Sequence, residues 1–192
     1  MNHEEWLERR KTGLTGTDIS AVMGLSKYKT AKDVWYDKLG YGHPIVENER
    51  MAWGKRLEPL IRDYYAETNG VSVAEVGFMR HKTEPWIIGT PDGVVVDDNG
   101  KHLWLLEIKT TRIMNKATEK LWLNGNVPID YMYQVYWYLL LLDLPFGDVA
   151  VLKNGSEYDQ IRINRNAEQE QVMIQKCKDF WFNYVVPKVQ IS

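Results

Sequence analysis

The chain has 192 residues, of which 24 are Lys or Arg and 26 are Asp or Glu, and its formal net charge is −2. This length predicts one domain over residues 1–192, and the near-neutral charge argues against a whole-surface nucleic-acid binder but not against a local basic channel. The single cysteine, Cys177, excludes an internal disulfide framework and a cysteine-ligated zinc or iron–sulfur site. Because no apolar run approaches the ~18 residues of a membrane helix and the charged N-terminus lacks a signal-peptide core, we expect a cytoplasmic protein without membrane association.

The first elements are predicted to be helices separated by a glycine-containing loop. A short helix over His3 to Lys11 is followed by a second helix over Asp18 to Met23, with Thr17 as its N-cap. A loop that leads into a helix N-terminus favours anions, and Arg10 just upstream could add a charge-assisted contact to a phosphate. The alternative is that Thr17 only caps the helix and Arg10 is only a solvated helix end.

Two further helices are predicted before the first strand. One is capped at Thr30 and extends to Leu39, and a loop over Tyr41 to Glu47 follows it. The other extends from Glu49 to Thr68 after an Asn cap and carries Glu58 beside its apolar stripe. That carboxylate is either functional or an ordinary surface glutamate.

The middle of the chain is predicted to be β-structure. Val71 to Met79 and Trp86 to Gly89 have strand composition, and a β-hairpin follows, formed by Val94 to Asp97 and His102 to Ile108. The hairpin is predicted to turn at Asn99-Gly100 in a type I′ turn, which requires positive φ at both central residues.

The register of this hairpin brings charged side chains together. Counting back from the turn places Asp92 opposite Glu107, with Cβ atoms about 4.5–5.5 Å apart. Two carboxylates placed in this way destabilise a sheet unless a charge such as that of a divalent cation neutralises them. Because side chains alternate along a strand, Lys109 shares the face of Glu107, whereas Ile108 points to the other side.

Phosphodiester hydrolysis requires this set of side chains. Carboxylate oxygens hold Mg²⁺ or Mn²⁺, and the ion polarises the phosphoryl group and lowers the pKa of a water. A neighbouring lysine can orient that water and offset transition-state charge. The alternative is a plain Pro91-Asp92-Gly93 turn with Glu107 and Lys109 at a solvated strand edge.

The rest of the chain, from Thr110 onward, completes a mixed architecture. Tyr131, Gln134 and Tyr138 form one stripe of a predicted helix, either functional or a half-buried face with amphipathic tyrosines. Helices and strands in this order predict a mixed α/β domain with a central sheet covered by helices. The predicted elements are a polar segment with a short helix over Thr110 to Val127, a helix over Tyr131 to Leu142, a second hairpin over Gly147 to Leu152 and Tyr158 to Ile163 turning at Asn154-Gly155, and a closing helix from Ala167 to about Val186.

Short blocks that span nearly the whole chain match the motifs of one family. They are Trp6 and Arg10 followed by LTGTDIS, then GLSKYKT, AWGKRLEP, GTPDG, LEIKT, Tyr131-x-x-Gln134 and Phe180-Trp181. In this order and spacing they resemble the phage-type, YqaJ-like recombination exonucleases, the lambda exonuclease family of the PD-(D/E)-x-K nuclease superfamily. The resemblance implies a restriction-endonuclease-like core, a central mixed β-sheet flanked by helices.

The resemblance also implies a role for each matching residue of the core. Asp92 and Glu107 would bind the catalytic Mg²⁺ or Mn²⁺, as two ions, with the main-chain carbonyl of Ile108 as a further ligand. Lys109 would position the attacking water. Glu58 would complete the acidic cluster from its helix, directly or through water.

Five further residues match motifs outside the hairpin. Gln134 would support the catalytic site, with Tyr131 nearby on the DNA-binding side. Arg10 would receive the terminal 5′-phosphate, helped by Thr15 and Thr17, and Thr17 stands where members of the family often have Ser.

The function implied by the resemblance is 5′→3′ degradation of one strand of linear double-stranded DNA. The remaining 3′ single strand would pass to a single-strand annealing protein, and the nuclease would be a homotrimer threaded by DNA in the cytoplasm of a phage-infected or prophage-bearing host. We expect local lysines such as Lys27, Lys29, Lys116 and Lys120 to line the DNA channel.

Three alternatives remain open from the sequence. An endonuclease of the same superfamily would cut closed circular DNA, whereas the iron–sulfur type of helicase-associated nuclease needs more cysteines than Cys177. A catalytically inactive DNA-end-binding protein would leave linear DNA intact. The third alternative is a structural α/β domain whose acids lie on the surface.

Overall fold

The structure, a computed structural model, describes residues 3–42 and 47–191, so residues 43–46 of the loop predicted over Tyr41 to Glu47 lie outside the description. The helices are α1 (His3–Arg10), α2 (Gly16–Val22), α3 (Ala31–Lys38), α4 (Glu49–Asn69), α5 (Lys116–Lys120), the 3-10 turn η1 (Leu123–Gly125), α6 (Ile129–Leu142), α7 (Ala167–Phe180) and the π-helical turn η2 (Trp181–Val185). The strands are β1 (Ser72–Ala74), β2 (Met79–Arg80), β3 (Ile88–Gly89), β4 (Gly93–Val96), β5 (His102–Thr111), β6 (Phe146–Lys153) and β7 (Glu157–Asn164).

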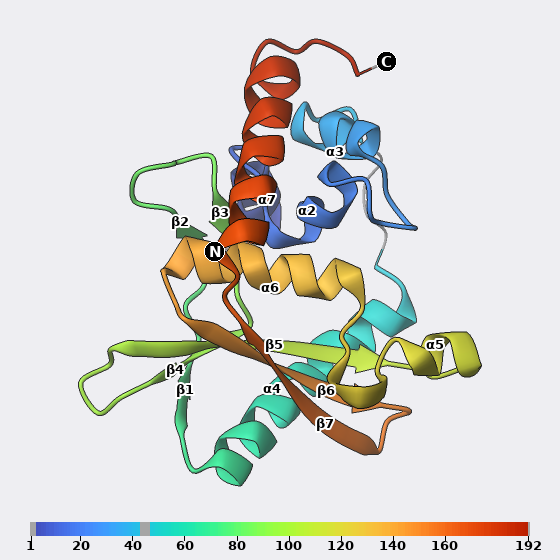
Figure 1. Cartoon of the computed structure of the whole chain (residues 1–192), viewed down its shortest axis with the longest axis vertical. Helices are drawn as coiled ribbons and strands as arrows, with labels where there is room; N and C mark the ends of the chain where they lie inside the picture. Colours follow the sequence, from blue (N-terminus) through green and yellow to red (C-terminus); the bar gives the residue numbers. More distant parts are fainter. Residues whose placement is uncertain (1–2, 43–46, 192) are drawn as a thin grey trace.

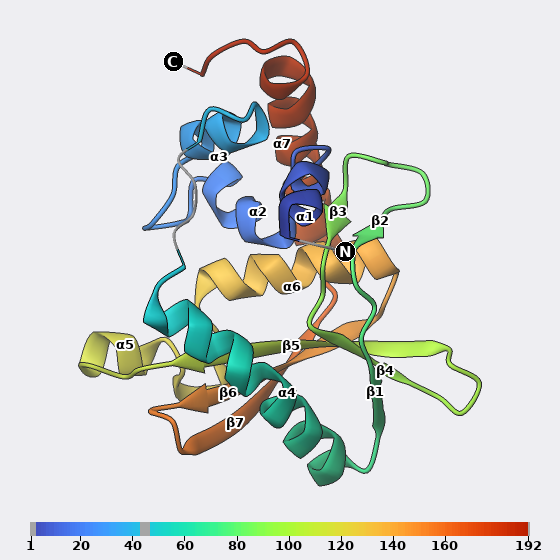
Figure 2. The same cartoon turned by 180° about the vertical axis from the view of Figure 1, so that it is seen from behind.

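A five-stranded mixed sheet forms the centre of the molecule. Its strand order is β1-β4-β5-β6-β7, and only the β5–β6 pair is parallel. Helix α6 lies along one face and α4 along the other, while α2, α3 and α7 stack beyond α6 (Figures 1 and 2). Neighbouring residues of β5 point to opposite faces, so Leu105 packs in the core under α6 and Leu106 in the core under α4. The predicted mixed α/β sheet flanked by helices is confirmed.

The strand predicted over Val71 to Met79 is wrong, because the chain divides there into β1 and β2, which belong to different sheets. Gly77 between them has a φ of +61°, in the left-handed region that favours glycine and interrupts an extended strand. Strand β2 pairs instead with β3, close to the position predicted for the second strand. The short sheet β2–β3 leads the chain toward Asp92.

The turn predicted for the first hairpin is also wrong. Gly100 N–H donates to the Asp97 carbonyl at 2.9 Å, and Asp97 N–H donates to the Lys101 carbonyl at 3.0 Å, which closes a three-residue loop. Gly100 has a φ of +76°, whereas Asn99 stays out of the positive-φ region. The Asp97 carboxylate explains the difference, since it accepts from the N–H groups of Asn99 and Lys101 at 2.9 Å each.

A β-bulge then restores the register that the site requires. The pairing shifts between Val96↔His102 and Val95↔Trp104, which leaves Leu103 as the additional residue on β5. From Val95 back to Gly93 at the start of β4 the pairing is the predicted one, with Gly93 opposite Leu106. Asp92 and Glu107 lie next to this pair, one residue further from the turn, and approach each other as predicted. The cause is the bulge that offsets a longer loop, and not a two-residue turn.

The other predicted elements agree with the structure. Asn154 and Gly155 have φ values of 56° and 80°, so the second hairpin turns at the predicted residues. Asn48 caps α4 and Gly70 ends it in the left-handed conformation. None of the helices within 3–42 and 47–191 combines the length and apolar character needed to span a lipid bilayer.

Candidate active site

The first group of charged side chains comes from β5 and from Asp92, the residue before β4. The carboxylate of Asp92 accepts a hydrogen bond at 2.7 Å from the main-chain N–H of Ile108 on β5. On the neighbouring positions of that strand, Lys109 Nζ donates to Glu107 Oε1 at 2.5 Å, as expected for residues i and i+2 on one face. Glu107 is completely buried, and Lys109 retains a small exposed fraction.

Helix α6 completes this group from above the sheet. Gln134 Nε2 donates to the same Glu107 Oε1 at 2.6 Å, and the Lys109 ammonium lies 4.9 Å from the centre of the Tyr131 ring. The i, i+3 spacing of Tyr131 and Gln134 places both over one end of β5. Tyr131, expected on the DNA-binding side with Arg10, thus contacts Lys109. We call Asp92, Glu107, Lys109 and Gln134 the acidic centre.

The acidic centre has an unsatisfied carboxylate oxygen. Oε1 of Glu107 accepts two hydrogen bonds, while its buried Oε2 has no hydrogen-bond partner among the residues that the structure describes. A buried acceptor of this kind is rare, because it forfeits hydration without compensation. A cation held by Asp92 and Glu107 would satisfy that oxygen, so these residues fit a divalent metal.

The electrostatics of the acidic centre agree with a missing positive charge. Burial raises the pKa of Glu107 to about 8, the negative charge of Asp92 adds to this shift, and Lys109 opposes it. Burial alone would lower the pKa of Lys109, but the charges of Glu107 and Asp92 outweigh burial and raise it. One lysine therefore does not neutralise the two carboxylates.

Glu58 approaches the acidic centre from α4, but its hydrogen bond is to Arg62 and not to a member of the centre. Its carboxylate accepts from Arg62 Nη2 at 2.7 Å, one turn further along the helix, and Arg62 also bonds Glu75. Burial and the charge of Asp92 raise the pKa of Glu58, while Arg62 opposes the shift. In the described part of the chain, no three His, Cys, Asp or Glu residues are arranged to hold a metal ion. Sequence reasoning missed Arg62, although its i, i+4 spacing from Glu58 was a usable signal.

A second group of charged side chains forms around the start of α2. Arg10 Nη2 donates to Thr17 Oγ1 at 3.0 Å, and the hydroxyl oxygens of Thr15 and Thr17 lie 3.1 Å apart. The structure thus brings together the three residues expected at the 5′-phosphate. The predicted N-cap is wrong, because Thr15 and not Thr17 caps α2. Asp18 accounts for this, since its carboxylate accepts from the Thr15 N–H and hydroxyl at 2.9 and 2.8 Å.

Asp18 is buried among three cations. Its carboxylate lies 2.6 Å from Lys38 Nζ, 3.3 Å from Lys29 Nζ and 3.9 Å from Arg10 Nη2. Burial would raise the pKa of Asp18, but Lys38, Lys29 and Arg10 outweigh burial and hold it well below its ordinary value. We call Arg10, Thr15, Thr17, Asp18, Lys29 and Lys38 the basic cluster.

Sequence reasoning missed two residues of the basic cluster. Asp18 was detectable, because Thr15-x-x-Asp18 is a capping pattern. Lys38 carried no local signal, since only the packing of α3 on α2 brings it to Asp18. Lys29 lies in the cluster, while Lys27, Lys116 and Lys120 are exposed elsewhere.

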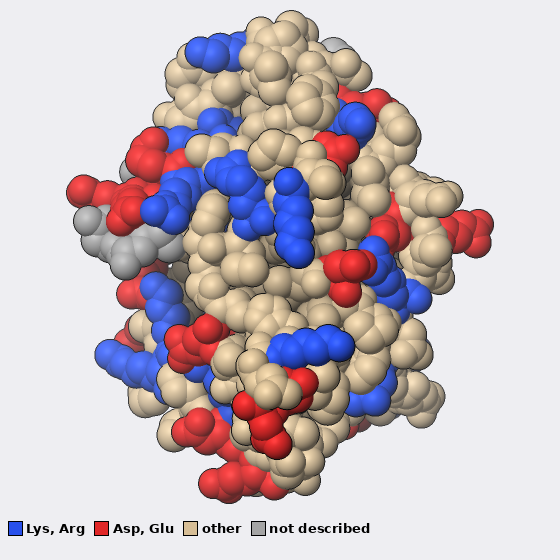
Figure 3. Space-filling view, turned by 90° about the vertical axis from the view of Figure 1, so that its left-hand side faces the viewer, with Lys and Arg blue, Asp and Glu red and all other residues tan. Residues whose placement is uncertain are grey.

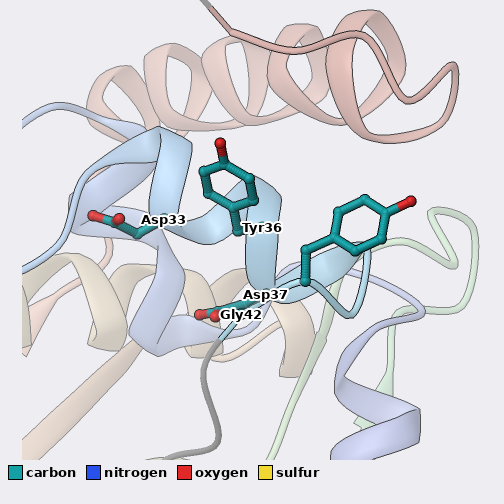
Figure 4. A pocket seen from close by; sticks show the side chains of 5 residues that line it. Asp33, Tyr36, Asp37 and Gly42 are labelled. Carbon is teal, nitrogen blue, oxygen red and sulfur yellow. The ribbon is translucent and has the colours of Figure 1, made fainter.

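A cavity of about 440 Å³ lies beside α3 and contains none of the expected site residues. Asp33, Tyr36, Asp37 and Tyr41 line it (Figure 4). Asp33 bonds Thr30, and Asp37 forms an ion pair with Lys29 at 2.6 Å. Both acids of this cavity are therefore already partnered.

Comparisons with solved structures show the fold of the chain. LHK-Exo, an alkaline exonuclease from Laribacter hongkongensis, matches with a TM-score of 0.78 and 22% identity over 97% of this chain and 94% of that chain. A phage related exonuclease from Haemophilus somnus 129PT matches with a TM-score of 0.59 and 15% identity, over 92% of this chain and 96% of that chain. At these identities the likeness shows a shared fold.

Sequence comparisons show the family. Protein YqaJ of Bacillus subtilis (strain 168) is 29% identical over 191 residues, which cover 97% of this chain and 57% of that protein. Protein R354 of Acanthamoeba polyphaga mimivirus is 36% identical over 91 residues, or 47% of this chain and 17% of that protein. The chain spans 57% or less of the length of these relatives. The family model of the YqaJ-like viral recombinase domain matches residues 5–143, and the chain belongs to this family.

Proposed function

We propose that this chain is a metal-dependent deoxyribonuclease that degrades one strand of linear double-stranded DNA in the 5′→3′ direction. The observation that carries the proposal is the unpartnered, buried Oε2 of Glu107 beside Asp92, with Lys109 bonded to the other oxygen. Two solved structures with this fold support it, an alkaline exonuclease and the same enzyme in complex with dAMP.

Mg²⁺ or Mn²⁺, as two ions, would be held by Asp92 and Glu107. The Ile108 N–H points at Asp92, and the N–H and C=O of one residue in a strand project to the same side, so the Ile108 carbonyl also fits as a ligand. Glu58, bonded to Arg62, would act through water. When bound, the metal supplies charge for the phosphoryl oxygens and a lower pKa for the attacking water.

The remaining residues of the acidic centre position reacting groups. Lys109, kept protonated by the two carboxylates, would orient the water and offset negative charge in the transition state. Tyr131 restrains the ammonium from above. Gln134 fixes one oxygen of Glu107, which leaves the other oxygen for the metal.

The basic cluster would receive the terminal 5′-phosphate. Arg10 offers a guanidinium, Thr15 and Thr17 offer hydroxyls, and Lys29 adds positive charge. On the side of the molecule where β2 and β3 lie, Figure 3 shows Lys and Arg side chains gathered across the upper middle, so positive charge is unevenly distributed on a chain whose net charge is −2. We extend the proposal to a homotrimer that encloses DNA and passes the 3′ strand to a single-strand annealing protein.

The proposal is tested with linear duplex DNA labelled at either the 5′ or the 3′ end, with a closed circle as control. We expect early release of the 5′ label, no cutting of the circle, activity in Mg²⁺ or Mn²⁺, and none in Ca²⁺ or chelator. Cutting of the circle would instead establish an endonuclease. Linear DNA that is bound but left intact in Mg²⁺ would establish an end-binding protein.

A further inference from the structure

The ring of Tyr138 lies between the two groups of charged side chains. Tyr138 is buried on α6, one turn after Gln134. A Cβ atom built on Gly16 would lie 2.8 Å from its Cζ, and one built on Gly89 would lie 2.5 Å from its Cε1. Neither glycine has the left-handed backbone, so what each position requires is space for the ring.

Each of the two glycines lies next to one of the two groups of charged side chains. Gly16 opens α2, between the Thr15 and Thr17 hydroxyls of the basic cluster. Gly89 ends β3, three residues before Asp92. One aromatic ring is therefore in close contact with the backbone that carries each group.

Gln134 makes a second connection between the groups. A Cβ on Gly16 would lie 2.9 Å from Gln134 Cγ, and the amide of the same side chain donates to Glu107 at 2.6 Å. Helix α6 thus contacts the start of α2 and the acidic centre through one side chain, that of Gln134.

The backbone forms an independent tether. Leu14 N–H donates to the Trp86 carbonyl at 2.8 Å, and Ile88 N–H donates to the Leu14 carbonyl at 3.0 Å. A Cβ on Gly13 would lie 2.3 Å from the Trp86 carbonyl oxygen, so the two segments are as close as their backbones allow. The loop before α2 is thus fixed to the strand before Asp92, and Tyr138 contacts the same two segments at Gly16 and Gly89.

We infer that Tyr138 is a positioning residue that sets the distance between the basic cluster and the acidic centre. It thereby selects which phosphodiester, counted from the 5′ end, is cut. The inference rests on the proposed function, because it requires a 5′-phosphate at the basic cluster. A fixed distance between an end-binding group and a cleaving group gives one product length, whereas a loose distance gives several.

The test compares Gly16→Ala with Gly147→Ala. The added methyl of Gly16→Ala meets the Tyr138 ring and must move α2 relative to α6. Gly147→Ala is a matched control, because its methyl meets the Leu105 side chain at 3.0 Å in the sheet, away from both glycines. The readouts are the lengths of the first products from 5′-labelled duplex and the ratio of rates on 5′-phosphate and 5′-hydroxyl ends.

We expect one product length from the wild type and from Gly147→Ala. Gly16→Ala should give several lengths and lower the rate ratio by roughly tenfold, since displacements well under 1 Å misalign reacting groups. Tyr138→Leu removes the ring atoms that clash with the new methyl. Added to Gly16→Ala, it should restore part of the ratio of rates on 5′-phosphate and 5′-hydroxyl ends. If Gly16→Ala does not fold, Tyr138→Leu alone should broaden the product lengths.

Other outcomes separate the inference from the proposed function. An unchanged product length and rate ratio in folded Gly16→Ala overturns the inference alone, as does an equal change in Gly147→Ala. A wild type that degrades 5′-phosphate and 5′-hydroxyl ends equally removes the 5′-phosphate from the basic cluster, and the inference with it. A wild type that leaves linear duplex DNA intact in Mg²⁺ removes the proposed function itself.

Discussion

The acidic centre and the basic cluster each contain a buried carboxylate, and the two carboxylates have opposite surroundings. Glu107 has a second carboxylate, Asp92, and one cation, Lys109, within its group. Asp18 has three cations, from Arg10, Lys29 and Lys38. Burial opposes ionisation at both positions, yet the pKa of Glu107 is raised and that of Asp18 is lowered.

The difference indicates which charge each group lacks. The acidic centre has more negative than positive charge and an oxygen without a partner among the described residues, so a cation would complement it. The basic cluster has a surplus of positive charge, and burial together with Arg10 and Lys29 lowers the pKa of Lys38 against the effect of Asp18. An anion would relieve that surplus. A metal ion and a DNA phosphate, the ligands of the proposed function, have these charges.

The largest expected effect is the loss of the acidic centre's chemistry. Lys109→Met should lower the rate by roughly 10²–10³-fold, the usual cost of one group that stabilises transition-state charge. The loss should be equal on 5′-phosphate and 5′-hydroxyl ends, because Lys109 lies outside the basic cluster. Single-turnover rates on both ends measure it, with circular dichroism to confirm folding. Retained activity would contradict the assignment.

Removing the charge of Asp18 should have the next largest effect, this time on stability. Asp18→Asn leaves three cations around a neutral side chain and should lower the free energy of unfolding by about 3 kcal/mol. Because the folded pKa is depressed below the ordinary 3.8, this stabilisation is present above pH 4 and is lost as pH falls further. Urea unfolding at pH 7 and pH 3 checks it. A difference from wild type that stayed constant between these values would exclude the electrostatic explanation.

Loss of Arg10 should distinguish the contribution of the basic cluster from that of the acidic centre, because it should change the rate on only one kind of DNA end. Arg10→Gln removes a charge-assisted contact and should slow degradation of 5′-phosphate ends by about tenfold, with little change on 5′-hydroxyl ends. Arg9→Gln is the matched control, since Arg9 pairs with Glu5 at 2.8 Å on the exposed side of α1. Equal losses in both variants would show that α1 contributes only general positive charge.

The smallest expected effect is a gain in stability at the acidic centre. The folded pKa of Glu107, about 8, lies above its ordinary 4.5, so its contribution is fully present below pH 4.5 and is lost as pH rises through 8. Without divalent cations, Glu107→Gln should therefore stabilise the protein at pH 8.5 by about 1–2 kcal/mol. Thermal unfolding with chelator tests this. Mg²⁺ should raise the melting temperature of the wild type more than that of the variant.

The comparison also shows how far the sequence predicts the site. The acidic centre depends on spacings within one hairpin and one helix, so the alternation of Glu107 and Lys109 and the stripe of Tyr131 and Gln134 were predictable. The basic cluster depends on the packing of three helices. Local pattern therefore located Arg10 and Thr17 but could not reveal the ion pair between Lys38 and Asp18.

The incorrect predictions of the first hairpin turn and of the strand over Val71 to Met79 share a cause. In each segment one residue favours a different backbone path from that favoured by the composition of the segment. Asn99-Gly100 has the composition of a type I′ turn, but the Asp97 side chain binds the N–H groups of the loop and stabilises a longer turn. In Val71 to Met79 the strand composition is overridden by Gly77, whose backbone turns the chain toward another sheet. In both segments one residue decided the backbone path, and composition averaged over the segment concealed it.

The bulge at Leu103 has a practical consequence for engineering. The three-residue loop moves one strand of the hairpin forward by one residue, and the bulge moves it back before β4 reaches Asp92. The bulge thus lies between the loop at Asp98 to Gly100 and the pairing that brings Asp92 toward Glu107. The exposed tip of this hairpin is a suitable place to insert a fluorescent label or an affinity peptide. The insertion should leave unchanged the approach of Asp92 to Glu107, on which the proposed cleavage depends.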